Sequence, residues 1–357
     1  MSATKLRYWV LLLCAVTLGG CSTVGYYSQA VGGHLKLMSK RQSIEKLLAD
    51  ESTDQDLRYK LETLIAARQF AINELSLPAN DSYSTYVETG RAAVTWNVVA
   101  TTEFSLVPVS WCFPIAGCVN YRGYYDREDA EHYAAALAEN KHDVTVGGAA
   151  AYSTLGWFDD PVYDTMLRGQ DIHYVGTLFH ELAHQLLYIQ DDSNFNEAFA
   201  SFVEQEGVRI WLNHRQQAER ISGYETSLQR AADFGDLLKK SREALIGVYS
   251  KDIPDDEKRR GKEAVFAQLL EGYEALKTNQ WGGYAGYDGW FRRGLNNARL
   301  VAVATYRQYV PAFAAMYDEA GQDLNRFYER AKEVGELPAE RRREEMQRYL
   351  DTAAATN

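Results

Sequence analysis

The feature that most constrains this chain is a pair of histidines four residues apart, His180 and His184, with Glu181 directly after the first. Side chains at positions i and i+4 of a helix lie on one face, about one turn apart, so both imidazoles can bind one metal ion. Glu181 lies on the same turn, where its carboxylate can accept a proton from a water that the metal activates. The spacing predicts a helix that carries two metal ligands and a general base.

A catalytic zinc ion usually has three protein ligands, and Glu197 is the predicted third ligand. The polar run 191–194 favours a turn and a helix N-cap. It ends the first helix and starts a second one near Asn194 or Phe195, with Glu197 in its first turn. The sequence therefore predicts two antiparallel helices within residues 171–215 that share one Zn²⁺ ion.

The motif 180–184 and the run 196–204, which reads NEAFASFVE, resemble the gluzincin pattern of thermolysin and aminopeptidase N. The run 196–204 is especially similar to aminopeptidase N. The gap between His184 and Glu197 is shorter than in those enzymes, so the connecting loop differs. With the N-terminus and segment 151–161 included, nearly the full length resembles a family of predicted bacterial aminopeptidases found as lipoproteins. The resemblance implies a zinc peptidase.

Aminopeptidase N carries a glutamate in its glycine- and alanine-rich strand, where it binds the α-amine of the substrate. The corresponding run 144–157 of this chain contains no acidic residue. Exopeptidase specificity therefore stays open, and four acids are candidates for the missing charge: Asp159, Asp160, Glu204 and Glu206. The alternatives to an aminopeptidase are a zinc endopeptidase of envelope proteins and a non-catalytic zinc-containing lipoprotein that serves as a binding module. Glu181 favours catalysis, because a structural zinc is normally closed by a fourth protein ligand.

Residues 1–20 have the pattern of a lipoprotein signal peptide, with two basic residues, an apolar run over 8–18 and two glycines before Cys21. The apolar run is short for a transmembrane helix, so we expect cleavage before Cys21 and lipidation of its thiol. An uncleaved anchor or a simple secretory signal is the alternative. Ser22 resembles the residue found in lipoproteins of the Gram-negative outer membrane, which predicts an envelope protein anchored there by lipid and facing the periplasm.

The remaining cysteines, Cys112 and Cys118, are an even pair separated by five residues. In an oxidising compartment such a pair favours a disulfide that closes a small loop. Two buried free thiols are the alternative.

Composition favours one large globular domain or two closely packed ones: 46% of the residues are hydrophobic and 24% are charged. We expect a lipidated, flexible tether over 21–42 and a single zincin-like domain over 43–350. Residues 83–157 form its β-rich part, which includes a helix over 126–140 with Asp126 as its N-cap. Residues 222–350 form a helical part with long helices over 222–249 and 256–277. The predicted fold is α+β and mainly helical, with a small β-sheet beside the metal-binding helix. The tail after residue 340 is expected to be a fraying helix.

Within the β-rich part, β-branched and aromatic runs predict three strands: Thr95–Ala100, Phe104–Pro108 and Tyr121–Tyr125. The glycine- and alanine-rich run 144–157 is placed to bind an extended substrate as an added strand. Tyr152 or Ser153 would then contact the substrate. A tight turn in the core is the alternative reading of this run.

Gluzincins stabilise the oxyanion of the reaction with zinc and with a tyrosine hydroxyl or a histidine from a later helix. Tyr306 is the predicted catalytic donor and Tyr309 the second choice, although both could be packing aromatics. Asn296 and Asn297 are candidates for substrate binding, with helix capping as the alternative role.

The formal net charge is −11, from 38 basic and 49 acidic residues. Nucleic-acid binding requires clustered lysine and arginine, so this balance argues against a nucleic-acid partner. The predicted partners are a peptide substrate and the membrane. The sequence does not predict an oligomeric state.

Overall fold

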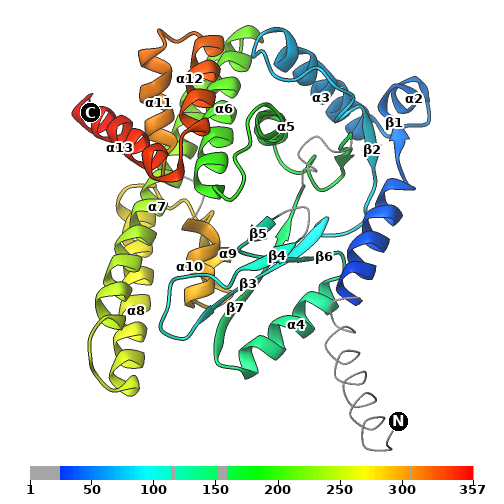
Figure 1. The fold of residues 1–357 in the computed structure, drawn as a ribbon. Coiled ribbons are helices and arrows are strands. Elements are labelled where there is room, and N and C mark those ends of the chain that lie inside the picture. The colour runs from blue at the N-terminus through cyan, green and yellow to red at the C-terminus, as the bar shows by residue number, and fades with distance from the viewer. Residues whose placement is uncertain (1–24, 114–116, 152–158, 305–307, 357) are drawn as a thin grey trace, which may run out of the picture.

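The structure is a computed structural model that describes residues 25–113, 117–151, 159–304 and 308–356. Within these ranges it is mainly helical, with small sheets on one side (Figure 1), as the sequence predicts. The described helices include none with the length and apolar character needed to cross a membrane. Four groups of predicted features lie outside the described residues: the signal peptide, Cys21, the pair Tyr152 and Ser153, and Tyr306.

Two helices, α5 (Asp171–Leu186) and α6 (Ser193–His214), occupy the centre of the larger hydrophobic core (Figure 1). Helix α3 (Gln55–Asn73) packs against α5, and α11 (Val310–Glu319) packs against α6. Helices α12 (Leu324–Glu336) and α13 (Ala339–Thr356) lie beside α11. Aromatic rings from α6, α11 and α12 fill this core, so the helix that carries Glu197 has little freedom to move.

The main sheet has three antiparallel strands in the order β6 (Arg122–Tyr124), β3 (Thr95–Thr102) and β7 (His142–Ala149). Helix α4 (Arg127–Glu139) packs on this sheet. The Asp126 carboxylate caps α4 by accepting hydrogen bonds from the Glu128 and Asp129 amides, as the sequence predicts. Among the described strands, β7 pairs only with β3, so it lies at an edge of the sheet.

Two smaller sets of strands accompany the main sheet. Strands β1 (Gln42–Ser43), β2 (Thr85–Val87) and β8 (Val162–Tyr163) form a second sheet, and α2 (Ile44–Ala49) follows β1. Strands β4 (Trp111–Phe113) and β5 (Gly117–Val119) form a hairpin.

Two long helices, α7 (Ile221–Tyr249) and α8 (Asp255–Asn279), pack against each other, close to their predicted bounds. The short 3₁₀ helix η1 (Ala218–Arg220) precedes α7. Helices α9 (Asp288–Phe291) and α10 (Asn297–Ala304) follow α8, and α10 lies between the long pair and strands β3 and β7 (Figure 1). Apolar residues of α7, α8 and α10 form a separate core.

The segment 104–108, predicted as a strand, is not one; only a single bridge between Thr101 and Pro108 is present. Two of its apolar residues pack against helices instead, whereas Val107 is 74% exposed. The ring of Phe104 lies 5.7 Å from that of Tyr249, and Leu106 packs against the second core. The aromatic and apolar run that predicted a strand therefore reflects contact with helices rather than strand pairing.

Residues 25–38, expected to be a flexible tether, are helical. Leu37 is only 4% exposed, and the ring of Tyr26 stacks on Phe113 at 5.5 Å. A Cβ on Gly33 would lie 2.2 Å from the ring of Tyr125, so this glycine permits close packing. The expectation of flexibility was wrong, because this segment is a helix in which Gly33 packs against Tyr125.

The C-terminal tail also packs more firmly than the sequence predicts. Helix α13 is continuous, and its residues Met346 and Tyr349 are fully buried. Met346 and Tyr349 stand among charged residues in the sequence, so no local pattern marked them as core positions.

Candidate metal centre

His180, His184 and Glu197 converge in the structure: their ligand atoms all lie within 4.8 Å of one another. The Nε2 atom of His180 is 3.4 Å from one Glu197 carboxylate oxygen, and Nε2 of His184 is 3.6 Å from the other. Ligands placed tetrahedrally about 2.1 Å from a zinc ion lie about 3.4 Å from one another. The two measured separations are close to this value, so the three side chains can serve as the protein ligands of one tetrahedral ion, with one position left for a non-protein ligand.

The short turn between α5 and α6 is held by Asn196, the residue before the candidate ligand Glu197. Its Oδ1 accepts a hydrogen bond from the Ile189 amide, and its Nδ2 donates one to the Ile189 carbonyl, both at 2.7 Å. Asp192 caps α6 by accepting from the Phe195 amide, and Arg342 of α13 pairs with the same carboxylate at 2.7 Å. These bonds let a connection shorter than the gluzincin pattern bring Glu197 opposite His184.

Glu204 lies two turns after Glu197 on α6 and accepts a hydrogen bond from Nδ1 of His180 at 3.2 Å. Gly176 on α5 makes this approach possible, because a Cβ there would lie 3.1 Å from the Glu204 carboxylate. A hydrogen-bonded carboxylate fixes the tautomer and the orientation of a metal-binding histidine. Glu204 therefore presents Nε2 of His180 to the metal position.

The charges of the cluster also fit a cation. Burial lowers the pKa of His180, but hydrogen bonds to Glu197 and Glu204 outweigh it and raise that pKa to about 10. Burial and the neighbouring His180 lower the pKa of His184 to about 4. Burial raises the pKa of Glu181 to about 7, and the charge of Glu197 adds to the rise. The carboxyl groups of Glu181, Glu197 and Glu204 surround the two imidazoles. Their excess of negative charge is one that a divalent cation would balance.

His180, Glu181, His184 and Glu197 line a cleft of about 890 Å³, within the size range of ligand sites. Gly147 and Gly148 of β7 form part of one wall, and a Cβ on Gly147 would meet no atom within 4 Å. Tyr121 and Tyr188 line the cleft near the metal cluster. Burial and the negative charge of Glu197 raise the pKa of Tyr121 to about 12, so its hydroxyl keeps the proton that a hydrogen-bond donor needs.

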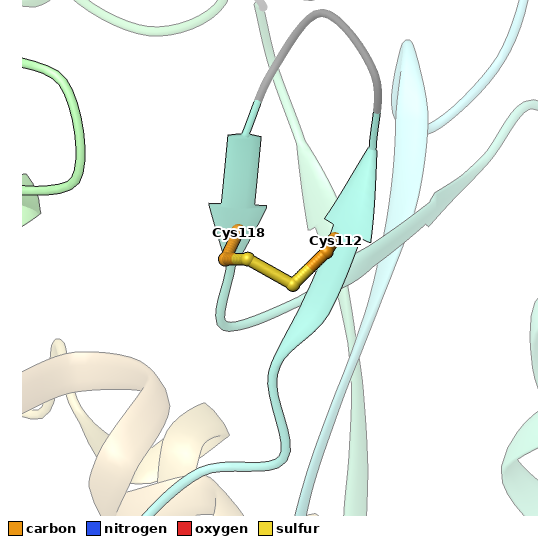
Figure 2. Close-up of a disulfide and its surroundings, with 2 residues drawn as sticks. All are labelled: Cys112 and Cys118. Carbon is orange, nitrogen blue, oxygen red and sulfur yellow. A yellow bond between two sulfur atoms is a disulfide. The ribbon is translucent and has the colours of Figure 1, made fainter.

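Another wall of the cleft is the β4–β5 hairpin, which a disulfide between Cys112 and Cys118 closes (Figure 2). Its residues Phe113 and Val119 line the cleft. A Cβ on Gly117 would lie 3.1 Å from the Asp191 carboxylate, so the hairpin reaches the turn between α5 and α6. The crosslink thus holds a wall of the cleft against the segment that positions Glu197.

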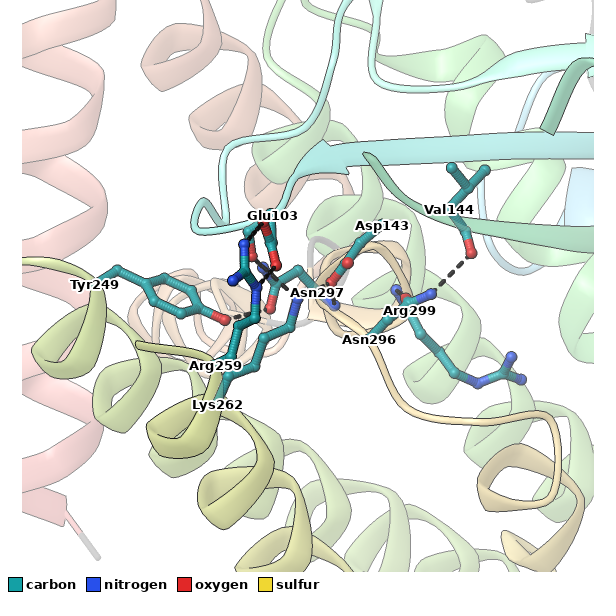
Figure 3. Close-up of polar contacts among 9 residues, drawn as sticks. All are labelled: Glu103, Asp143, Val144, Tyr249, Arg259, Lys262, Asn296, Asn297 and Arg299. Carbon is teal, nitrogen blue, oxygen red and sulfur yellow. Dashed lines mark hydrogen bonds and ion pairs between the residues drawn. The ribbon is translucent and has the colours of Figure 1, made fainter. Parts of the chain in front are cut away.

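Asn296 and Asn297 lie at the junction of β7, α8 and α10 rather than in the cleft lining (Figure 3). Asn296 donates to the Val144 carbonyl at 2.8 Å and accepts from the Arg299 amide at 2.9 Å. Asn297 is fully buried and bonds to the Tyr249 hydroxyl and the Glu103 carbonyl. The capping alternative fits Asn296, and Asn297 joins the helices to the sheet.

Tyr309, the second choice for an oxyanion donor, does not line the cleft; it packs against the main core at the start of α11. Burial and the charge of Asp192 raise its pKa.

The four acids proposed as amine anchors are not in the cleft lining either. Glu204 binds His180, as described above, and Glu206 pairs with Arg209 at 3.1 Å. Asp160 is 2% exposed, and Asp159 is exposed at the surface. No described residue therefore supplies the amine-binding acid that the resemblance to aminopeptidase N implied.

The sequence reading missed the orienting role of Glu204 and the two tyrosines of the cleft. Glu204 follows Glu197 by seven residues, which is two helical turns on the same face, so the sequence did contain its signal. Tyr188 follows His184 by four residues. Tyr121 has no such signal, because only the tertiary fold brings β6 and its neighbours to α5.

We expect Glu204→Ala to weaken metal binding by about 10- to 100-fold, because His180 loses the bond that orients its ring. Competition with a chelator of known affinity measures the change. Glu204→Gln, whose amide oxygen can accept the same hydrogen bond, should recover part of the affinity. Glu206→Ala is the matched control on α6 and should bind metal like the parent; equal affinity in Glu204→Ala would contradict the orienting role.

The fold and the site together define a mainly helical α+β protein with a His-His-Glu cluster in a cleft. Residues 25–346 match the profile of a family described as "Putative aminopeptidase". Since the match covers most of the chain, the protein belongs to this family. Neither the curated proteins nor the solved structures contain a match to it.

Proposed function

We propose that this protein is a zinc-dependent peptidase with a zincin-like active site, and that it acts as an aminopeptidase. The convergence of His180, His184 and Glu197 on one point, with Glu181 beside them in the cleft, is the observation that carries the proposal. The family description supports a peptidase that removes N-terminal residues.

In this proposal each polar group of the cluster has one task. His180, His184 and Glu197 hold the zinc ion, and Glu204 orients His180. When bound, zinc lowers the pKa of a water molecule and polarises the scissile carbonyl. Glu181 accepts the proton of the attacking water and delivers it to the leaving amine.

The outer edge of β7 is the proposed binding site for an extended peptide. The Ala149 carbonyl faces β3, where it accepts from the Val94 amide, and the Val144 carbonyl faces the other side, where it meets Asn296. Backbone groups of successive strand residues point to opposite sides, so those of Val146 and Gly148 face outward. A substrate strand can bond to these groups beside the metal centre.

A tyrosine hydroxyl is proposed to stabilise the oxyanion. Tyr306 remains the prediction from the sequence, and Tyr121 is a second donor because it lines the cleft near Glu197 and keeps its proton. The enzyme is proposed to act in the cell envelope, as a lipoprotein anchored through Cys21 to the outer membrane and facing the periplasm.

A panel of peptides with free and N-acetylated amino termini tests the specificity. We expect cleavage confined to the free termini, with one residue released at a time. Cleavage of both sets at internal bonds would instead establish an endopeptidase. Failure to cleave any peptide with zinc bound would favour a binding module.

A further inference from the structure

Away from the metal cluster, the ionised side chains that line the cleft are basic. The only described acids in its lining are Glu181 and Glu197, both of which belong to the metal centre. The stretches outside the described residues contain no Asp or Glu. Arg293 and Arg299 line the same cleft, so its chemistry is suited to a negatively charged part of a substrate.

Arg299 is buried without a carboxylate partner. Its exposed fraction is 8%, and no described carboxylate lies within 4.0 Å of its guanidinium. The Nε atom is buried with no hydrogen-bond partner among the described residues, and Nη1 reaches only the Thr145 hydroxyl, at 3.5 Å. The ring of Trp290, which also lines the cleft, lies 5.3 Å from the guanidinium carbon.

The nearby ion pairs do not use this arginine. Lys262 pairs with Asp143 at 2.6 Å, and Arg259 pairs with Glu103 at 2.6 Å. In Figure 3 the guanidinium of Arg299 extends away from these groups, while its backbone amide is bonded to Asn296. The backbone of Arg299 is therefore held at the start of α10, and its side chain is available to the cleft that it lines.

An unpaired buried guanidinium is costly, because arginine does not lose its proton in proteins. Burial and the charge of Arg293 disfavour the charged form and lower the pKa of Arg299, with no acid to offset them. A bound carboxylate would offset this cost, since it accepts two parallel hydrogen bonds from one guanidinium.

We propose that Arg299 binds a carboxylate of the substrate. This inference rests on the proposed peptidase function and specifies its substrate class as peptides that carry a carboxylate within the cleft. Two sources share this chemistry: the C-terminal carboxylate of a short peptide and an acidic side chain of a longer one. The exposed Arg293 adds positive charge beside the same position.

Binding to the full-length, zinc-loaded Glu181→Gln protein tests the inference without turnover. The probes are trialanine, trialanine amide, and the amide of Ala-Glu-Ala, with affinities measured by calorimetry. We expect at least one carboxylate-bearing probe to bind about 10- to 100-fold more tightly than trialanine amide, the usual range for a charge-assisted bond. A preference for trialanine identifies the C-terminal carboxylate, and a preference for the glutamyl amide identifies the side chain.

The same titrations in a second set of variants assign the preference to one residue. Arg299→Gln should remove it, Arg299→Lys should keep part of it, and Arg292→Gln should leave it unchanged. Arg292 is an exposed neighbour outside the cleft lining, so it is the matched control. Equal binding of all three probes to the parent, or a full preference in Arg299→Gln, would overturn the inference.

Thermal melting separates this role from a structural one. Because Arg299 has no carboxylate partner among the described residues, we expect Arg299→Gln to melt no lower than the parent. A clear loss of stability in both Arg299 variants, with binding preference retained in the folded fraction, would show a structural role and contradict the inference. Failure of the peptidase proposal is distinguishable, since it would appear as absent Glu181-dependent turnover while the carboxylate preference persisted.

Discussion

Glu181→Gln is expected to lower kcat for peptide hydrolysis by about 10²- to 10⁴-fold, the usual contribution of a general acid and base. The substitution keeps the size of the side chain but removes the carboxylate that accepts the proton. Since His180, His184 and Glu197 remain, zinc content should equal that of the parent. Steady-state kinetics and metal analysis of the same sample measure both quantities.

The control for this experiment is Gln185→Ala, which changes the residue directly after His184. Gln185 bonds to Asn80 and Ser82 and does not line the cleft, so its loss should leave kcat nearly unchanged. Normal turnover in Glu181→Gln would contradict the assigned role. Loss of zinc from that variant would assign Glu181 to metal binding instead.

Phe199→Ala is expected to lower the free energy of unfolding by about 3–5 kcal/mol, the usual cost of truncating a buried aromatic ring. Phe199 is fully buried, and its ring lies 5.6 Å from Phe313 and 5.8 Å from Phe327. It follows Glu197 by two residues on α6, so its ring lies on a different face of the helix from the metal ligand. Denaturant unfolding of the metal-free protein measures the change apart from any effect of zinc.

Tyr59→Ala provides the comparison for this stability measurement. Tyr59 is 58% exposed, so its truncation should change the free energy of unfolding by no more than about 0.5 kcal/mol. A loss in Phe199→Ala as small as that of the control would mean that the core around α6 is not packed as described.

The parts of the fold that the sequence predicted well are set by local patterns. The spacing of His180 and His184, the cap at Asp126 and the long α7 and α8 helices each depend on residues within a few turns. The approach of Glu197 to the histidines was also predictable, because the polar run 191–194 allows only a short connection. The mainly helical α+β class followed from the same patterns.

The remaining features depend on contacts between distant segments. Leu106 packs against helices more than a hundred residues later in the chain. Because the local sequence does not contain this contact, the apolar run 104–108 was interpreted as a strand. The helix over residues 25–38 packs against the rest of the protein where Gly33 meets Tyr125, a contact that no local pattern contains. Arg299 resembles any solvated arginine until the fold buries it beside Trp290. For this reason the sequence alone did not indicate the residues of the cleft that lie beyond the metal ligands.

Removal and return of the metal tests the central claim most directly. The full-length protein would be assayed against peptides with free termini, stripped with a chelator, assayed again, and then titrated with zinc while bound metal is counted. The account predicts that activity disappears on stripping and returns as one zinc ion binds per chain. Unchanged peptide hydrolysis by protein shown to be free of metal would contradict it.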